Sequence, residues 1–222
     1  MINTILWDWN GTLLDDVQLV VDVNNRVFTA YGLPPTTVEK YRSCFRFPIR
    51  EYYRDLGVTD DIFDEVAHAW YEGFLESFPG CPLHKEAVEA AKTFKAAGYR
   101  QVIISASKVD ALREQVASYP ELDGLFDDVL GLDNIYAASK VALATGYMAA
   151  GNLSPDTVLF LGDTTHDAEV AAAIGCSCLL ISGGHQPDAV LRQSGCQVVR
   201  DCTEAVRLTL SGFAESNPQP MR

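Results

Sequence analysis

Three polar residues stand at or just beyond the ends of short apolar runs, namely Asp8, Ser105 and Asp163. Ligands of open parallel sheets bind beyond the carboxyl ends of the strands, so these side chains are expected at one rim. Lys140 opens a helical pattern farther along the chain, and Asp167 follows Asp163 by one helical turn. Carboxylates, a hydroxyl and a lysine are therefore expected to converge on a single site.

Two carboxylates at adjacent strand ends are unfavourable as neighbours unless a cation offsets their charge. Mg²⁺ favours oxygen ligands, a couple of carboxylates, retained waters and a phosphate oxygen. The sequence therefore predicts a Mg²⁺ site. Its predicted ligands are Asp8, Asp163 and Asp167, together with the backbone carbonyl of Asn10.

The same rim offers groups that bind a phosphoryl group through charge and hydrogen bonds. The predicted binding set is Gly11, Thr12, Ser105, Ala106 and Lys140. Asp8 is the predicted nucleophile, because carboxylates form acyl-phosphates when a metal and a lysine offset the developing charge. His185, which follows two glycines, is expected on this rim as well.

The elements that must position these residues are short strands alternating with helices. The apolar runs that read as buried strands are Ile5–Trp7, Val102–Ile104, Val129–Leu130, Val158–Leu161 and Cys178–Ile181. Helical patterns follow several of these runs, as at Val141–Ala150 and Ala168–Ile174. The alternation predicts an α/β fold with a doubly wound parallel sheet.

One long segment after the first strand breaks the alternation. Apolar residues at helical spacing run from Val17 to Tyr31 and from Phe63 to Phe78, with no convincing strand between Asp16 and Phe78. The segment is too long for a crossover and is predicted to be a helical insertion. The predicted division is a core of residues 1–15 and 80–222 and a small helical cap of residues 16–79.

Four segments in order resemble the motifs of the haloacid dehalogenase superfamily: DWNGTLLD, the run ending at Ser105, Lys140, and GDTTHD. The insertion resembles the helical cap of the phosphoglycolate phosphatase-like branch. The resemblance covers almost the whole chain. It implies Mg²⁺-dependent phosphoryl transfer on small phosphate esters, with Asp8 as nucleophile, Ser105 as the second-motif hydroxyl, and Asp163 and Asp167 at the metal.

Asn10 departs from that pattern, because phosphatases of the family usually carry a second aspartate there to act as general acid and base. An amide donates a hydrogen bond but no proton at neutral pH. Both half-reactions should therefore slow by about 10²- to 10⁴-fold unless another group takes over. Asp15 and His166 are the candidates considered for that relay.

The stretch from Cys44 to Arg50 is a turn-like segment between helices, and it carries two arginines in an acidic chain. Arg46 or Arg50 is a candidate to hold a carboxylate or second phosphate on the leaving group. Packing within the cap or on the surface is the competing interpretation of each.

The chain has 222 residues, with 17 lysines plus arginines against 30 aspartates plus glutamates and a formal net charge of −13. That charge disfavours nucleic acid and anionic membrane surfaces as partners. The start lacks a basic region and a long apolar core, and the six cysteines show no CxxC pair, so a cytoplasmic location is expected. The sequence leaves the oligomeric state undetermined.

The function that the sequence predicts is a Mg²⁺-dependent phosphatase, slowed by Asn10, acting on a small phosphorylated metabolite such as a phosphoglycolate-like ester or a sugar phosphate. Two alternatives stay open at this point. One is a weak or inactive phosphate-binding or regulatory protein, and the other is a phosphotransferase.

Overall fold

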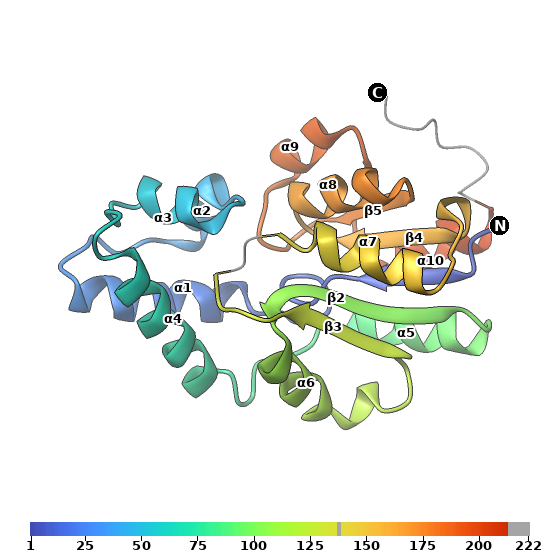
Figure 1. Ribbon diagram of the computed structural model, residues 1–222, viewed down its shortest axis with the longest axis horizontal. Coiled ribbons are helices and arrows are strands. Elements are labelled where there is room, and N and C mark those ends of the chain that lie inside the picture. The colour runs from blue at the N-terminus through green and yellow to red at the C-terminus, as the bar shows by residue number, and fades with distance from the viewer. Residues whose placement is uncertain (137–138, 213–222) are drawn as a thin grey trace.

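A single parallel sheet of six strands forms the centre of the molecule, in a computed structural model that describes residues 1–136 and 139–212 (Figure 1). The strand order is β3-β2-β1-β4-β5-β6. The strands are β1 (Thr4–Trp7), β2 (Arg100–Lys108), β3 (Asp128–Leu132), β4 (Val158–Gly162), β5 (Ser177–Ile181) and β6 (Gln197–Val199). This arrangement confirms the predicted doubly wound α/β class.

Helices cover both faces of the sheet, as its parallel crossovers require. The helices of the core are α5 (Lys85–Ala96), α6 (Val109–Ala117), α7 (Val141–Ala150), α8 (Thr165–Ile174), α9 (Asp188–Leu191) and α10 (Cys202–Leu210). Successive strand residues alternate between two apolar clusters. Ile5 and Trp7 belong to the cluster that includes α5 and α10, whereas Leu6 belongs to the one that includes α7 and α8. Strands buried on both faces account for the uninterrupted apolar runs of the sequence.

The central strands agree with the predicted runs, and the differences lie at their ends. β2 continues through Ser105 to Lys108, with a shift in its pairing to β3 after Ile104. β6 was not predicted. It is a three-residue edge strand, too short to produce a pattern of its own.

Four helices lie in the chain between β1 and α5: α1 (Val17–Ala30), α2 (Val38–Cys44), α3 (Ile49–Asp55) and α4 (Phe63–Ser77). We call them the helical insertion. α1 packs along α4 and also contacts α2 (Figure 1). The predicted turn at Cys44–Arg50 is shorter in the structure, because Cys44 ends α2 and α3 already begins at Ile49.

The two chain segments that connect the insertion to the core run side by side. The Asp15 amide donates to the Pro82 carbonyl at 2.9 Å, and the His84 amide donates to the Leu13 carbonyl at 2.9 Å. The insertion thus leaves and re-enters the core at one place. The boundaries of the cap at residues 16 and 79 stay a prediction.

None of the helices found within residues 1–136 and 139–212 is both long enough and apolar enough to span a membrane.

Candidate active site

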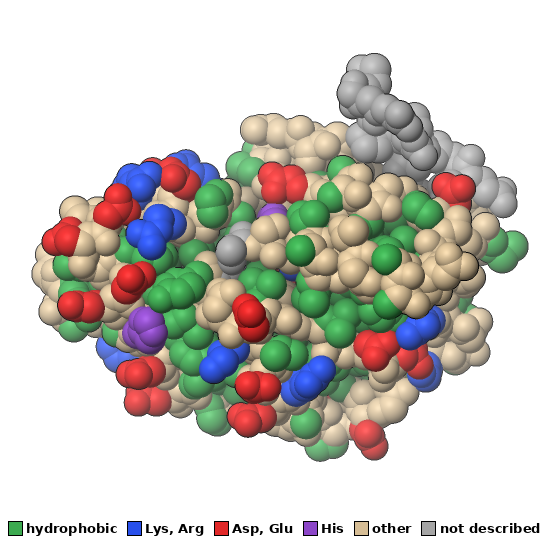
Figure 2. Space-filling model, in the orientation of Figure 1, with side chains coloured by type: hydrophobic (Ala, Val, Ile, Leu, Met, Phe, Trp, Pro, Cys, Tyr) green, Lys and Arg blue, Asp and Glu red, His purple; other side chains and the backbone are tan. Residues whose placement is uncertain are grey.

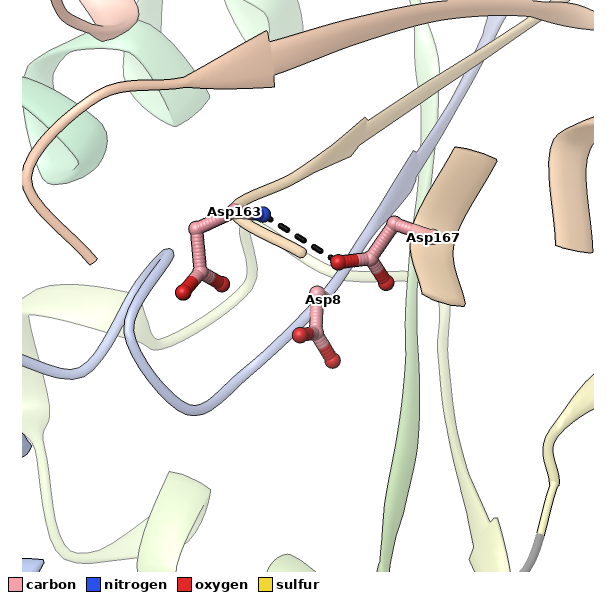
Figure 3. Close-up of side chains that lie close together, drawn as sticks. All are labelled: Asp8, Asp163 and Asp167. Carbon is pink, nitrogen blue, oxygen red and sulfur yellow. Dashed lines mark hydrogen bonds between the residues drawn. The ribbon is translucent and has the colours of Figure 1, made fainter. Parts of the chain in front are cut away.

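Three carboxylates meet beyond the ends of the central strands (Figure 3). β1 pairs with β4 so that Trp7 lies opposite Leu161. Asp8 follows Trp7 directly and Asp163 lies two residues after Leu161, so both emerge at the same edge of the sheet. Asp167 reaches the same point from the first turn of α8. One oxygen from each carboxylate lies within 4.8 Å of the other two, a spacing that suits a shared cation.

Burial makes negative charge on neighbouring carboxylates unfavourable. Asp163 and Asp167 are completely buried, and Asp8 is nearly so. Burial, followed by repulsion from Asp167, raises the pKa of Asp8 to about 8. Burial also raises the pKa of Asp163, and Asp167 adds to that effect. A cation would relieve both penalties, because it favours the charged form of each carboxylate.

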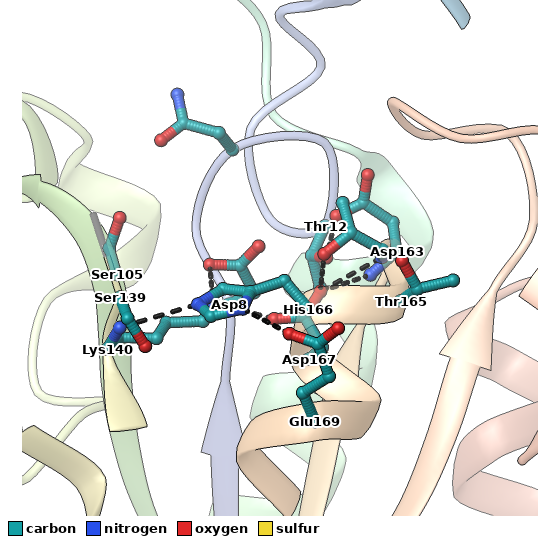
Figure 4. A network of polar contacts seen from close by, with 12 residues as sticks. Asp8, Thr12, Ser105, Ser139, Lys140, Asp163, Thr165, His166, Asp167 and Glu169 are labelled. Atoms are coloured by element: carbon teal, nitrogen blue, oxygen red, sulfur yellow. Dashed lines mark hydrogen bonds and ion pairs between the residues drawn. The ribbon is translucent and has the colours of Figure 1, made fainter. Parts of the chain in front are cut away.

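Lys140 joins two of these carboxylates (Figure 4). Its Nζ atom lies 2.5 Å from Asp8 Oδ1 and 2.6 Å from Asp167 Oδ1. Burial alone would lower the pKa of Lys140, but Asp167 and Asp8 outweigh it and raise the pKa above the ordinary lysine value. The ammonium therefore stays charged and supplies one of the positive charges that this site needs.

Hydrogen bonds fix the orientation of Asp163. Thr12 donates its hydroxyl to Asp163 Oδ1 at 2.8 Å, and the backbone amide of His185 donates to Oδ2 at 2.6 Å. Gly11 has φ +74, and a Cβ atom at that position would overlap both Asp163 and the His185 ring. Glycine is therefore required at position 11 for its conformation and for the close approach of the loop.

Asp167 is held by the helix that it caps. Its Oδ2 accepts hydrogen bonds from the Thr164 amide at 2.9 Å and the Thr164 hydroxyl at 2.7 Å. These bonds belong to a capping box at the N-terminus of α8. Asp167 Oδ2 thus accepts backbone amides from the turn that leads into α8, while Oδ1 lies beside Lys140 Nζ.

Asn10 is held at both ends of its side chain. Its amide nitrogen donates to Asp16 Oδ2 at 2.7 Å, and its carbonyl oxygen accepts from the Ser107 hydroxyl at 2.9 Å. Ser105, nearby on β2, accepts the Ser107 amide at 3.0 Å. Asn10, Ser105 and Ala106 all line the cavity above the carboxylates.

Asp16 is a buried carboxylate that the sequence analysis did not assign to the site. It accepts the Gly11 amide at 2.9 Å and lies 3.2 Å from the Nε2 atom of His185. Burial would lower the pKa of His185, but the nearby Asp16 outweighs it and raises the pKa to about 9. The pair is therefore an ion pair at neutral pH. The doubled Asp15-Asp16 in the sequence was the available signal, but it does not show which of the two points inward.

His185 also connects the core to the insertion. Its Nδ1 atom lies 2.6 Å from the Tyr41 hydroxyl of α2. Arg42 donates to the backbone carbonyls of Gly183 and Gly184, with 2.8 Å for the bond from Nε to Gly184. The expectation that His185 lies on this rim is thus met, and the insertion residues that hold its loop could not be foreseen from spacing.

The two arginines proposed for the leaving group do not line the cavity. Arg46 pairs at the surface with Asp55 at 2.8 Å, and Arg50 pairs with Asp60 at 3.3 Å. Arg50 also lies over the ring of Phe63, 3.7 Å from its centroid. The acidic residues of the insertion therefore neutralise both guanidinium groups where they stand.

The two relay candidates are not placed beside Asn10. Asp15 points outward, where it is half exposed and lies 3.9 Å from His84. His166 is buried, pairs with Glu169 at 3.0 Å and stacks on Phe47 with centroids 4.5 Å apart. Asp16 is the carboxylate that contacts the Asn10 side chain.

Comparison with known proteins identifies the class. Residues 5–181 match the model of the haloacid dehalogenase-like hydrolase family. The match covers most of the chain and includes all four segments of the site. The chain belongs to the haloacid dehalogenase-like hydrolases.

Its curated relatives are distant and carry phosphatase names. Phosphoglycolate phosphatase 1 of Pseudomonas aeruginosa is 23% identical over 190 residues, which cover 82% of this chain and 70% of the relative. Probable phosphatase IndB of Dickeya dadantii is 25% identical over 205 residues, which cover 89% of this chain and 88% of the relative.

Solved structures share the fold across nearly the whole chain. A haloacid dehalogenase-like family hydrolase from Streptococcus pneumoniae superposes with a TM-score of 0.82 at 18% identity, covering 94% of this chain and 98% of that one. CbbY from Rhodobacter sphaeroides, solved in complex with phosphate, gives 0.72 at 18% identity, covering 92% and 96%.

Proposed function

We propose that this hydrolase is a Mg²⁺-dependent phosphatase that cleaves a small phosphate monoester through an aspartyl-phosphate on Asp8. The observation that carries the proposal is the buried trio of Asp8, Asp163 and Asp167, joined by Lys140. The phosphatase names of the relatives support the same reaction class.

The residues fit a divalent cation, because three buried carboxylate oxygens converge and burial raises the pKa of Asp8 and of Asp163. Asp8, Asp163 and Asp167 would hold Mg²⁺, with the Asn10 carbonyl as a further ligand. When bound, the ion supplies positive charge that offsets the carboxylates and orients the phosphoryl oxygens. Lys140, Ser105 and the amides near Gly11 and Thr12 would hold the remaining phosphoryl oxygens.

In the first half-reaction, a carboxylate oxygen of Asp8 forms a bond to phosphorus while the bond from phosphorus to the ester oxygen breaks. The departing alkoxide takes a proton from solvent, because Asn10 has none to give. In the second half-reaction, the oxygen of water forms a bond to phosphorus while the bond from phosphorus to the Asp8 oxygen breaks, the proton of that water passes to solvent, and inorganic phosphate leaves. Both proton transfers lack a carboxyl group at position 10, so turnover is expected to be slow.

Hydrolysis of para-nitrophenyl phosphate tests the proposal, because its leaving group needs little protonation. Wild-type protein with Mg²⁺ should release nitrophenol, and Asp8→Asn should abolish release. Asp15→Asn is the matched control, since that carboxylate is half exposed beside His84 and should leave the rate unchanged. Intact-mass measurement during turnover should show a phosphoryl adduct on the wild type alone.

Other results would redirect the assignment. Phosphate binding without any release of nitrophenol would favour a binding or regulatory protein and overturn the proposed reaction. Release that accelerates with an added alcohol acceptor, with the phosphoryl group recovered on that acceptor, would favour a phosphotransferase, because Asn10 also slows the attack of water.

A further inference from the structure

A cavity above the carboxylates separates two very different surfaces. Its space, including the part open to solvent, is about 1090 Å³. Asp8, Ser105 and Lys140 lie on the core side. Aromatic rings of the insertion form much of the opposite wall, among them Tyr52, Trp70 and Phe74. On the face shown in Figure 2, hydrophobic side chains lie on the insertion near its junction with the core.

The insertion side of the cavity offers no guanidinium or ammonium group. Among residues 1–136 and 139–212, Lys108 and Lys140 are the only lysines or arginines that line it, and both come from the core. Arg46 and Arg50 are engaged with surface carboxylates, and Arg42 is engaged with the His185 loop. A carboxylate or second phosphate on the leaving group would meet a balancing ammonium only on the core side, at Lys108, and none along the aromatic wall, where burying its charge is costly.

Two polar atoms in that wall lack hydrogen-bond partners in the described part of the chain. They are Asn24 Oδ1 and Trp70 Nε1. Asn24 is almost completely buried, and its amide nitrogen is already used on the Tyr52 hydroxyl at 2.8 Å. Both residues line the cavity. Both atoms are fully buried, so the wall presents mainly aromatic carbon to the cavity.

We propose that the preferred substrate is the phosphate ester of an uncharged, ring-sized apolar alcohol and is neither a phosphoglycolate-like ester nor a sugar phosphate. This inference rests on the proposed phosphatase reaction, with the phosphoryl group at Asp8 and the alcohol part against the insertion. The rings of the insertion exclude water from an apolar leaving group. Sugar hydroxyls packed against these rings would exchange water for aromatic carbon.

Steady-state kinetics on benzyl phosphate, 2-phosphoglycolate and glucose 6-phosphate test the preference. Burial of one aromatic ring is expected to raise kcat/KM by about 10- to 100-fold. The kcat/KM for benzyl phosphate should therefore exceed those for 2-phosphoglycolate and glucose 6-phosphate by that factor. If para-nitrophenyl phosphate is hydrolysed but phosphoglycolate or glucose 6-phosphate equals benzyl phosphate, the inference fails and the phosphatase stands. If the protein hydrolyses none of the four, the proposed function itself fails.

Variants of α4 separate a specific pocket from general hydrophobicity. Trp70→Ala should reduce kcat/KM for benzyl phosphate about tenfold. Tyr71→Arg adds a cation to a partly exposed cavity residue and should raise phosphoglycolate relative to benzyl phosphate. Leu75→Ala is the matched control, because Leu75 is 36% exposed on the same helix and does not line the cavity. An unchanged benzyl preference in both folded variants would overturn the inference.

Discussion

At the scale of single residues, Asn10 sets the expected rate. Its side chain contacts Asp16 and Ser107 and lines the cavity, so the position has the access that a general acid needs but lacks the proton. Asp16 cannot substitute through this contact, because an amide between a carboxylate and the substrate does not relay a proton. On the proposed reaction, turnover is therefore expected to be limited by the missing carboxyl group at position 10.

Restoring a carboxyl group at this position should raise turnover. Asn10→Asp places a carboxylate against Asp16, and two carboxylates so close share a proton, which makes one of them an acid near neutral pH. We expect kcat on benzyl phosphate to rise at least tenfold, towards the 10²- to 10⁴-fold typical of general acid–base catalysis.

The control for this experiment exchanges the two side chains. In Asn10→Asp/Asp16→Asn, an amide again faces a carboxylate, so the local hydrogen bond is kept while the acid moves to position 10. Asp16→Asn alone should give no gain. Folded single and double variants with wild-type kcat would contradict the role assigned to position 10.

At the scale of elements, the insertion is attached to the site through α2. Tyr41 contacts His185, and Arg42 binds the carbonyls of the preceding glycines. The same loop supplies the amide that orients Asp163. The position of α2 and the geometry of the carboxylates are consequently linked through a single short segment.

Removing the arginine contact should weaken substrate binding. A hydrogen bond from a charged group contributes about 1.5 to 3 kcal/mol, and partial exposure of Arg42 reduces that. We expect Arg42→Ala to raise KM about 3- to 10-fold, measured with benzyl phosphate. Arg46→Ala removes a surface ion pair of the same insertion and should leave KM within twofold of the wild type. Equal KM values for the two variants would show that the contact has no influence on binding.

Most of the core elements could be predicted from sequence, because strands buried on both faces produce dense apolar runs. The predicted helix at Val141–Ala150 has the same bounds as α7. β6 was missed because three residues at a sheet edge carry almost no periodicity. The middle of the insertion was also hard to predict, since α2 and α3 are only seven residues each.

The residues of the candidate site that lie at strand ends could be predicted from the sequence. Asp8 and Asp163 follow from strand pairing, and Asp167 follows from helical spacing. Asp16 and Tyr41 did not follow, because their positions depend on how the insertion folds back over the core. Arg46 and Arg50 were misplaced for a related reason: their spacing does not show that Asp55 and Asp60 of the insertion pair with them at the surface.

At the scale of the whole molecule, β1, α7, β4 and α8 each bring a charged group to one buried point. Burial disfavours ionised carboxylates, so the arrangement is costly until positive charge balances it. Lys140 supplies part of that balance. A divalent cation should therefore stabilise the fold as well as serve the reaction.

Thermal unfolding with and without Mg²⁺ measures this coupling. At a concentration 100-fold above its Kd, a ligand of the native state adds about 2.7 kcal/mol, which corresponds to a rise in Tm of about 5–10 °C for a chain of this size. Asp163→Asn should lose the rise, and Asp15→Asn should keep it. A wild-type Tm that does not respond to Mg²⁺ would argue against the metal site.

Asp16 immediately precedes α1, and its carboxylate accepts hydrogen bonds from the Asn10 side chain and the Gly11 amide. The start of α1 is thus attached directly to the loop that contains Asn10 and Gly11. A rotation of the insertion that admitted substrate or released product would therefore displace the Asp16 carboxylate. The shape of the cavity and the hydrogen bond from the Asn10 amide to Asp16 would then change together.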